Sequence, residues 1–390
     1  MKKFDLCIVG GGMVGAATAI GCAQQGYSVC LIEPNPPSPY EPQQAPDLRV
    51  SAINMHSVEL LKQLGVWSHI TQMRLTPYNG LECWEQETAK TRFDAADVNY
   101  PQLGYFIENR LLQIALLEQI SQTFMDNVTL VSNTSVKIID VETGEVELDD
   151  SQTIKAALII GADGANSQVR KAAGIGVTGW RYGQNANVIS VKMHQSFDPV
   201  TWQQFTPTGP LAFLPMHEKF ASLVWYADQS TTDFIKSASN AELMTAIKQA
   251  FPKQLGDFDI LDKAYFPLIR SHANQYYSGK ALLLGDAAHT INPLAGQGVN
   301  LGFKDVSCFL NYLEKYGVSD VSSLYSRYQR NRKPQNLLMM SAMDLIYATF
   351  SNNITPIKVM RNLGLKVADS AGLLKVGVLK YAMGLASLKE

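Results

Sequence analysis

The glycine-rich opening of the chain constrains its fold more than any other stretch. Residues 4–9 are typical of a buried strand, and a Gly-x-Gly-x-x-Gly turn follows at residues 10–15. Residues 14–25 predict an alanine-rich helix, and residues 27–32 predict a second strand. A strand, a glycine turn, a helix and a second strand in this order predict a Rossmann-like α/β unit that binds the pyrophosphate of a dinucleotide.

Each glycine of this turn has a separate predicted role. Gly10 permits the tight turn, Gly12 lets the backbone approach the pyrophosphate, and Gly15 lets the helix pack closely on the strand. Glu33 ends the second strand, about 20 residues further on, where it is placed to bind ribose hydroxyls. Because a carboxylate there disfavours a 2′-phosphate, the bound adenosine should come from FAD or NAD rather than from NADP.

A second informative stretch lies near residue 290. The apolar run 281–284 ends at a Gly-Asp pair, as a buried strand does when it reaches a loop, and residues 299–305 predict a helix. A helix N-terminus carries roughly half a positive charge and favours anions. Asp286 can accept hydrogen bonds from ribityl or ribose hydroxyls of a ligand. The backbone amides of Gly296 and Gly298 can stabilise a negative charge that develops on the same ligand. A simpler interpretation is that the Gly-Asp pair only caps the next helix.

The full motif is more specific than its parts. It reads Gly285-Asp286-Ala287-Ala288-His289, then Pro293, Gly296-Gln297-Gly298, Asn300, Gly302 and Asp305. This string resembles the second flavin motif of the para-hydroxybenzoate-hydroxylase-type flavoprotein monooxygenases, and its spacing is most similar to the FAD-dependent hydroxylases of ubiquinone biosynthesis. Residues 161–170 resemble the Asp-Gly fingerprint of the same family, and residues 47–52 resemble a further motif. The resemblance extends over nearly the whole chain.

The resemblance implies a chemistry. The family binds FAD non-covalently, uses NAD(P)H as electron donor, and lets reduced flavin react with O2 to a C4a-hydroperoxide that hydroxylates an electron-rich ring. The implied substrate is a polyprenyl benzoquinol of ubiquinone biosynthesis, 2-polyprenyl-3-methyl-6-methoxy-1,4-benzoquinol. Three alternatives stay open: a sister hydroxylase acting at another ring position, a flavin oxidoreductase, and a non-catalytic FAD-bearing scaffold of the same fold.

The resemblance also implies roles for individual residues. The expected surroundings of the flavin ring and oxygen are Pro293, Gly296, Gln297 and Gly298. The expected cofactor-binding residues are Gly10, Gly12, Gly15, Glu33, Arg49, Arg110, Asp163, Asp286, Gly298 and Asn300. Simpler interpretations exist: Arg49 is a solvated surface residue, and Asp163 caps the helix that follows it. His289 is expected to be structural rather than a general base.

Composition excludes several other classes of protein. A net charge of −2 and a pI near 6.3 give no electrostatic reason to expect a nucleic-acid partner. The five cysteines lack CxxC spacing, so reduced thiols are expected and a metal site is not. Residues 6–32 carry no charge, but glycines interrupt them too often for a membrane span. We expect a cytoplasmic protein, either free or peripheral to the inner membrane.

The pattern predicts an α/β protein in three parts. An FAD-binding domain takes residues 1–75, 101–180 and 270–335, and an inserted, mostly antiparallel β-sheet takes residues 76–100 and 181–269 for the substrate. A helical C-terminal region takes residues 336–390. Strand-like alternation at residues 81–93 belongs to the inserted sheet, and residues 306–316, 322–333 and a run from 337 predict helices.

The end of the chain combines apolar and basic residues. Residues 352–390 carry Leu, Val, Met and Tyr at roughly helical spacing, and lysines recur among them. This composition is typical of a helix that lies on an anionic membrane or contacts other quinone-biosynthesis proteins. An ordinary amphipathic helix packed on its own domain has a similar pattern.

Overall fold

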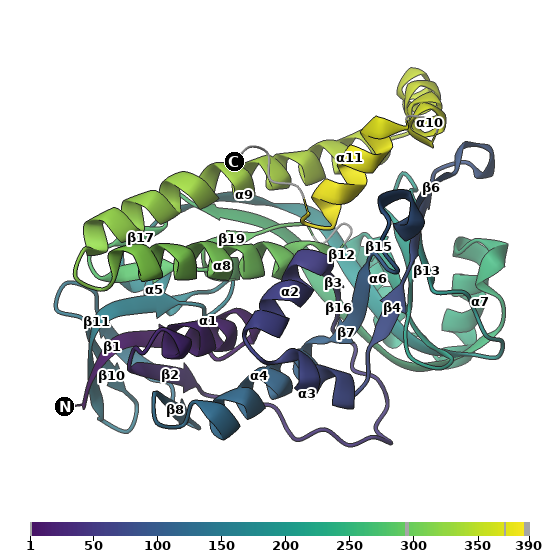
Figure 1. The fold of residues 1–390 in the computed structure, drawn as a ribbon. Coiled ribbons are helices and arrows are strands. Elements are labelled where there is room, and N and C mark those ends of the chain that lie inside the picture. Colours follow the sequence, from purple (N-terminus) through teal and green to yellow (C-terminus); the bar gives the residue numbers. More distant parts are fainter. Residues whose placement is uncertain (1, 293–295, 370–371, 386–390) are drawn as a thin grey trace.

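The computed structural model describes residues 2–292, 296–369 and 372–385. It contains two eight-stranded sheets and a small three-stranded one, with helices packed against them (Figure 1). The domain boundaries expected from the sequence stay a prediction. The mixed α/β architecture, with a Rossmann-like sheet and a largely antiparallel second sheet, is confirmed.

The first sheet carries the glycine turn. Its strands are β1 (Lys2–Val9), β2 (Val29–Glu33), β8 (Val128–Ser132), β9 (Val136–Asp140), β10 (Glu145–Leu148), β11 (Thr153–Gly161), β17 (Tyr277–Ser278) and β18 (Ala281–Leu283). Strands β18, β11, β1, β2 and β8 are parallel neighbours in that order, and the first strand of the chain lies in the middle. In such a sheet, ligands bind beyond the carboxyl ends of the strands.

The second sheet is mainly antiparallel. Its strands are β5 (Gly80–Trp84), β6 (Thr91–Asp94), β12 (Val177–Met193), β13 (Val200–Gln204), β14 (Leu211–Pro215), β15 (Phe220–Ala227), β16 (Phe258–Ala273) and β19 (His289–Thr290). The long strands β12 and β16 pair along most of their length and link this sheet to the first. A single strand over residues 81–93 is wrong, because the chain turns after Trp84 and returns as β6.

Helices surround the sheets. They are α1 (Met13–Gln24), α2 (Met55–Gln63), α3 (Trp67–Gln72), α4 (Asn109–Thr123), α5 (Gln168–Ala172), α6 (Gln229–Ser237), α7 (Asn240–Ala250), α8 (Gly298–Tyr316), α9 (Val321–Phe350), α10 (Thr355–Asp369) and α11 (Leu373–Ala382). The small sheet consists of β3 (Val50–Asn54), β4 (Thr76–Tyr78) and β7 (Gly104–Glu108).

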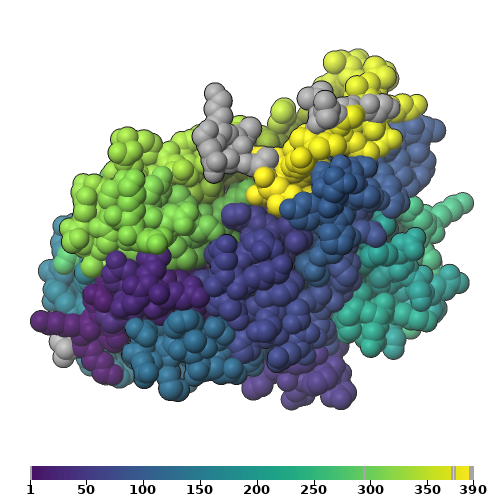
Figure 2. Space-filling model, in the orientation of Figure 1, coloured from purple at the N-terminus to yellow at the C-terminus, as the bar shows by residue number. Residues whose placement is uncertain are grey.

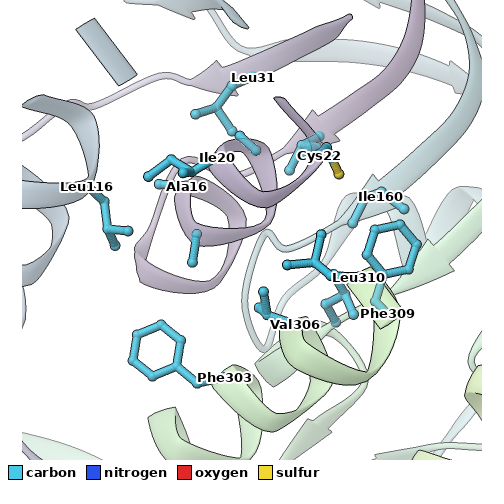
Figure 3. Packing of buried hydrophobic residues seen from close by; sticks show 14 of the residues in the cluster. Ala16, Ile20, Cys22, Leu31, Leu116, Ile160, Phe303, Val306, Phe309 and Leu310 are labelled. Atoms are coloured by element: carbon cyan, nitrogen blue, oxygen red, sulfur yellow. The ribbon is translucent and has the colours of Figure 1, made fainter. Parts of the chain in front are cut away.

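The core of the first sheet fixes the position of α8, the helix that follows the Gly-Asp motif. Ala16 and Ile20 of α1 belong to the same buried cluster as Val306 and Leu310 of α8 (Figure 3), and Gly21 of α1 lies directly against Leu310. A Cβ on Gly21 would lie 2.2 Å from the Leu310 side chain, so the two helices approach closely only because this residue is glycine. This contact holds the two dinucleotide motifs, which are far apart in sequence, against each other.

The break expected near residue 334 does not occur. Helix α9 runs without interruption from Val321 to Phe350 and includes Pro334. A proline inside a helix removes one hydrogen bond and costs about 3 kcal/mol. Arg332 and Asn336, one on each side of it, both donate to Asp305 of α8. These buried contacts hold both halves of α9 against α8, which explains why the helix continues.

Candidate active site

A cavity of about 640 Å³ lies where the two sheets and α8 meet. Sites for small molecules occupy roughly 300–1,000 Å³, so this volume is suitable for a ligand. One wall combines the glycine turn with polar groups: Gly12, Arg49, Asp286, Gly296, Gln297 and Gly298. The facing wall is largely apolar and comes from the second sheet: Val188, Trp202, Leu214, Val224, Tyr226 and Phe266. Leu379, Ala382 and Met383 at the C-terminal end of the chain also line it.

The glycine turn has the geometry that its spacing predicts. Gly10 has φ of +100°, and a Cβ there would lie 2.5 Å from the Ala162 carbonyl oxygen. A Cβ on Gly15 would lie 1.8 Å from the Gly10 carbonyl oxygen, which excludes any side chain. At Gly12 nothing lies within 4 Å of the same position, so the backbone is open to the cavity. Open backbone at the N-terminus of α1 suits a phosphate group.

Glu33 lies at the carboxyl end of β2, over this turn. Its Oε1 accepts from the backbone N–H of Asn35 at 3.0 Å. Gln113 donates to both the Gly11 carbonyl oxygen, at 2.9 Å, and Glu33 Oε2, at 3.4 Å. The carboxylate is half-buried and keeps acceptor capacity beside the crevice where a dinucleotide ribose binds.

Asp286 projects from the loop after β18. Gly285 has φ of +58°, and a short 3-10 helix (Gly285–Ala287) follows. The Asp286 side chain is exposed to the cavity, yet protein surrounds it closely. This burial raises the pKa of the carboxyl, although the charges of His289 and Arg49 act in the opposite direction. A carboxylate in this position is a strong acceptor for ligand hydroxyl groups.

Asp305 holds that loop from behind. Its Oδ2 accepts from the Gly285 backbone N–H at 3.1 Å and lies 2.5 Å from His289 Nε2. Its Oδ1 accepts from Arg332 Nε at 2.7 Å and from Asn336 Nδ2 at 3.1 Å. Burial alone would raise the pKa of Asp305, but the charges of His289 and Arg332 outweigh it and hold the pKa well below its usual range. Its contact with Asp305 makes His289 part of this network, and a structural role for His289 stays a prediction.

The N-terminus of α8 faces the cavity through Gly296, Gln297 and Gly298. Asn300, in the first turn of α8, is buried: its Nδ2 donates to the Ala52 carbonyl oxygen at 2.7 Å, and its Oδ1 accepts from the Asn54 backbone N–H at 3.0 Å. Asn300 thus joins α8 to β3 and is turned away from the cavity. Pro293 lies outside the described residues.

The two predicted arginines lie in different surroundings. Arg49 lines the cavity, and its guanidinium lies 5.2 Å from the centroid of the Phe266 ring. Arg110 is not among the cavity residues in the described part of the chain. Its Nε donates to Asp47 at 2.9 Å, and its Nη1 donates to the carbonyl oxygens of Ser38 and Pro39. Arg110 therefore anchors the proline-rich segment at residues 34–47, and a contact with flavin stays a prediction for it.

Asp163 binds the N-terminus of α5, the helix that follows it, although the N-cap residue itself is Ser167. Its Oδ2 accepts from the backbone N–H groups of Gln168 and Val169 at 2.6 and 3.2 Å. Its neighbours Ala162 and Gly164 line the cavity, whereas Asp163 is not among the lining residues that the structure describes. This motif shapes the wall through its backbone.

Comparison with known proteins assigns the chain to a family. Residues 3–341 match the protein-family model whose description is FAD binding domain. The chain is 47% identical to 3-demethoxyubiquinol 3-hydroxylase of Escherichia coli K12 over 385 residues, which cover 98% of both chains. It is 32% identical to ubiquinone hydroxylase UbiL of Rhodospirillum rubrum, over 99% of this chain and 91% of that one. The chain belongs to this family of FAD-dependent hydroxylases.

Solved structures of family-like proteins share the fold. A probable FAD-dependent monooxygenase of Pseudomonas aeruginosa, pqsL, superimposes with a TM-score of 0.77 at 20% identity, over 93% of this chain and 99% of that one. The p-nitrophenol 4-monooxygenase PnpA of Pseudomonas putida DLL-E4 superimposes with a TM-score of 0.80 at 18% identity over the full length of both chains. At these identities the likeness concerns the fold.

The cavity of this hydroxylase fits FAD. The open backbone at Gly12 suits the pyrophosphate, Glu33 the ribose, and Asp286 the ribityl hydroxyls. The sequence motifs did not indicate the residues that support these groups, namely Arg332, Asn336 and Gln113. Arg332 and Asn336 are spaced i, i+4 on one helix face, which is the only local signal that they act together.

Proposed function

We propose that this flavoprotein hydroxylates the ring of a polyprenyl benzoquinol in ubiquinone biosynthesis, with NAD(P)H and O2 as co-substrates. The substrate we propose is 2-polyprenyl-3-methyl-6-methoxy-1,4-benzoquinol, hydroxylated at its unsubstituted ring carbon. The reaction consumes one NAD(P)H and one O2, places one oxygen atom on the ring and releases the other as water. The 47% identity to a demethoxyubiquinol hydroxylase supports this choice of ring.

One observation carries the proposal: a single cavity is lined both by the glycine turn and polar groups typical of dinucleotide binding and by apolar and aromatic side chains of the second sheet. Trp202, Tyr226 and Phe266 of the second sheet face the side that Gly12 and Asp286 form. An uncharged, substituted ring suits aromatic and aliphatic neighbours, and the enclosed volume excludes water. A nicotinamide dehydrogenase or a nucleotide-binding scaffold would not need such a wall.

Bound FAD supplies the transfer of electrons from NAD(P)H to O2. The residues of the chain bind the cofactor and orient it toward the substrate. Asp286 would accept from ribityl hydroxyls, and the amides of Gly296 and Gly298 at the α8 N-terminus favour negative charge on the reduced ring. Arg49, over Phe266, places a positive charge at the border between the two walls. The apolar wall keeps water from the reacting atoms.

The test is turnover of a short-tailed demethoxy benzoquinol by the purified holoprotein. We expect NAD(P)H consumption to depend on the quinol and the product to gain one oxygen atom in mass spectrometry. Consumption of NAD(P)H with peroxide as the only product would identify a flavin oxidase instead, and absence of flavin reduction would identify a scaffold. Accumulation of an earlier precursor in a deletion strain would identify a sister hydroxylase.

The proposed substrate also decides where the protein works. Each methylene-sized unit of a prenyl tail costs about 0.8 kcal/mol in water, so the tail remains in a membrane or in a partner protein. We therefore propose a cytoplasmic protein that contacts the inner membrane peripherally and works beside other quinone-biosynthesis proteins. In the described residues no helix is long and apolar enough to cross a membrane.

A further inference from the structure

Helix α10 packs on the protein through its polar side. Arg361 and Asn362 are its buried residues, and both donate to Glu85 at the end of β5: Arg361 Nε to Oε2 at 2.8 Å and Asn362 Nδ2 to Oε2 at 2.5 Å. Arg361 Nη1 also donates to the Thr349 carbonyl oxygen at 2.7 Å. The side chains of Glu85 and Arg361 are 5% and 2% exposed, so this ion pair fixes the rotation of the helix.

The opposite side of α10 is apolar and faces outward. Val359, Met360, Leu363 and Val367 are 63, 73, 60 and 60% exposed. Their spacing, i, i+1, i+4 and i+8, places all four on one helix face. More than half of the large apolar side chains that are exposed in the described residues lie after residue 336. Helix α10 projects from the edge of the molecule, so this face is accessible (Figures 1 and 2).

A basic residue borders this face on one side. Lys366 is exposed and lies beside Val359 and Leu363 on the helix, while Lys358 is half-buried on the same flank, further round toward Glu85. The acidic residue of α10, Asp369, accepts from the Arg92 backbone N–H and from Lys375, so it is neutralised on the inner side. An apolar stripe with an exposed lysine along one border is complementary to a bilayer that contains anionic lipids.

We propose that the outer face of α10, formed by Val359, Met360, Leu363 and Val367, inserts into the surface of an anionic phospholipid bilayer. This inference rests on the proposed function for its purpose, because a substrate with a prenyl tail is dissolved in the bilayer. Helix α11 follows α10 directly, and its Leu379 and Ala382 line the cavity. Docking through α10 would therefore place the substrate cavity close to the bilayer surface.

The bilayer fits this face better than a protein partner does. Helix α10 projects from the edge of the molecule (Figure 2), and its four apolar side chains are 60–73% exposed. A projecting apolar stripe can enter the acyl boundary of a membrane without a complementary pocket. Lys366 then remains at the level of the head groups.

The test is co-sedimentation of the full-length holoprotein with vesicles of phosphatidylcholine, with and without phosphatidylglycerol. We expect binding to the anionic vesicles, and at least a tenfold lower partition for Met360→Gln/Leu363→Gln. Lys366→Gln should weaken binding to anionic vesicles and reduce its dependence on salt. Because these side chains are exposed, the variants should keep their FAD content and their turnover of a short-tailed quinol, while turnover of vesicle-embedded long-tailed quinol falls.

A matched control uses exposed apolar residues of the first sheet region. Met125→Gln/Ile138→Gln replaces side chains that are 69 and 53% exposed, far from α10, and should bind vesicles as wild type does. The proposal is overturned if the wild-type protein binds neither type of vesicle, or if the α10 variant binds vesicles as tightly as the wild type does. Loss of capture by a purified quinone-biosynthesis protein in the α10 variant, without vesicle binding by wild type, would assign the face to that protein. Vesicle binding that follows this pattern in a protein without hydroxylase activity refutes the proposed function and leaves the membrane face standing.

Discussion

Replacing Asp305 by Asn tests the network behind the Gly-Asp loop. The carboxylate is fully buried and accepts on both oxygens, from Arg332 and Asn336 on one side and from Gly285 on the other, with His289 also beside it. Asparagine keeps the shape, loses the charge, and turns one acceptor into a donor that faces other donors. Arg332, whose side chain is 3% exposed, is then left charged without its counterion.

The expected loss is large. Breaking a buried ion pair by removing one partner costs about 3–5 kcal/mol, because the remaining charge stays buried. Whole proteins are stable by only about 5–15 kcal/mol, so the variant should fold but unfold at clearly lower denaturant concentration. The Gly285 N–H loses its charged acceptor as well, and the loop that presents Asp286 should loosen. We therefore expect lower FAD occupancy in addition to lower stability.

Urea unfolding of wild type, Asp305→Asn, Arg332→Gln and the double variant measures the coupling free energy between Asp305 and Arg332. If the pair acts as described, the double variant should be less destabilised than the sum of the single variants by roughly 1–3 kcal/mol. Flavin absorbance after gel filtration gives the occupancy of each. Additive single effects, or an Asp305→Asn variant with wild-type stability, would show that the network does not hold the loop.

Three further outcomes follow from the structure. Asp286→Ala should lose most of its flavin, since unpaired ribityl hydroxyls cost on the order of 1–3 kcal/mol each; full occupancy at micromolar protein would contradict the assignment. Glu85→Gln should leave Arg361 buried without its counterion and release α10, which faster proteolysis in residues 350–370 would reveal while the first sheet stays protected. His272 is buried and near His289, which lowers its pKa from 6.5 to about 4. Between these two pH values His272 is protonated in the unfolded chain but neutral in the folded protein. The free energy of unfolding that this difference contributes is fully present above pH 6.5 and is lost as the pH falls toward 4. At about 1.4 kcal/mol per pKa unit this amounts to roughly 3 kcal/mol, and His272→Gln should flatten the pH profile of urea unfolding; an unchanged profile would exclude this source.

Local chemistry made much of the fold predictable. The glycine turn, the strands around it and the helix after the Gly-Asp pair lie close to their predicted residues, because each depends on neighbours within about 20 residues. The cavity brings together Gly12, Arg49, Asp286 and residues 296–298, which the motifs had marked separately. Their contacts with flavin stay a prediction, as does the role of Arg110, which lies in the first turn of α4 and donates to Asp47 and to the Ser38 carbonyl oxygen.

Contacts between distant residues explain what could not be predicted. Pro334 indicates a helix break. Arg332 and Asn336, however, bind Asp305 on a different helix, and these contacts stabilise α9 on both sides of the proline, so that the helix continues. Glu85, just after β5, is buried in the same way by a distant partner, Arg361, which is 276 residues away. A single sequence shows neither partner, because nothing in the local pattern distinguishes a paired charge from a solvated one.

The rotation of α10 follows from the same contact. Its apolar residues predict an amphipathic helix, and packing of that apolar face on the domain is the usual arrangement. In the structure the Glu85–Arg361 pair faces inward, and four apolar side chains face outward. Breaking the buried pair would cost about 3–5 kcal/mol, and covering an exposed apolar side chain of this size contributes at most about 1.5–3 kcal/mol. The buried pair therefore holds α10 in this rotation, and the outward side chains gain that burial energy when an apolar phase such as the proposed bilayer covers them.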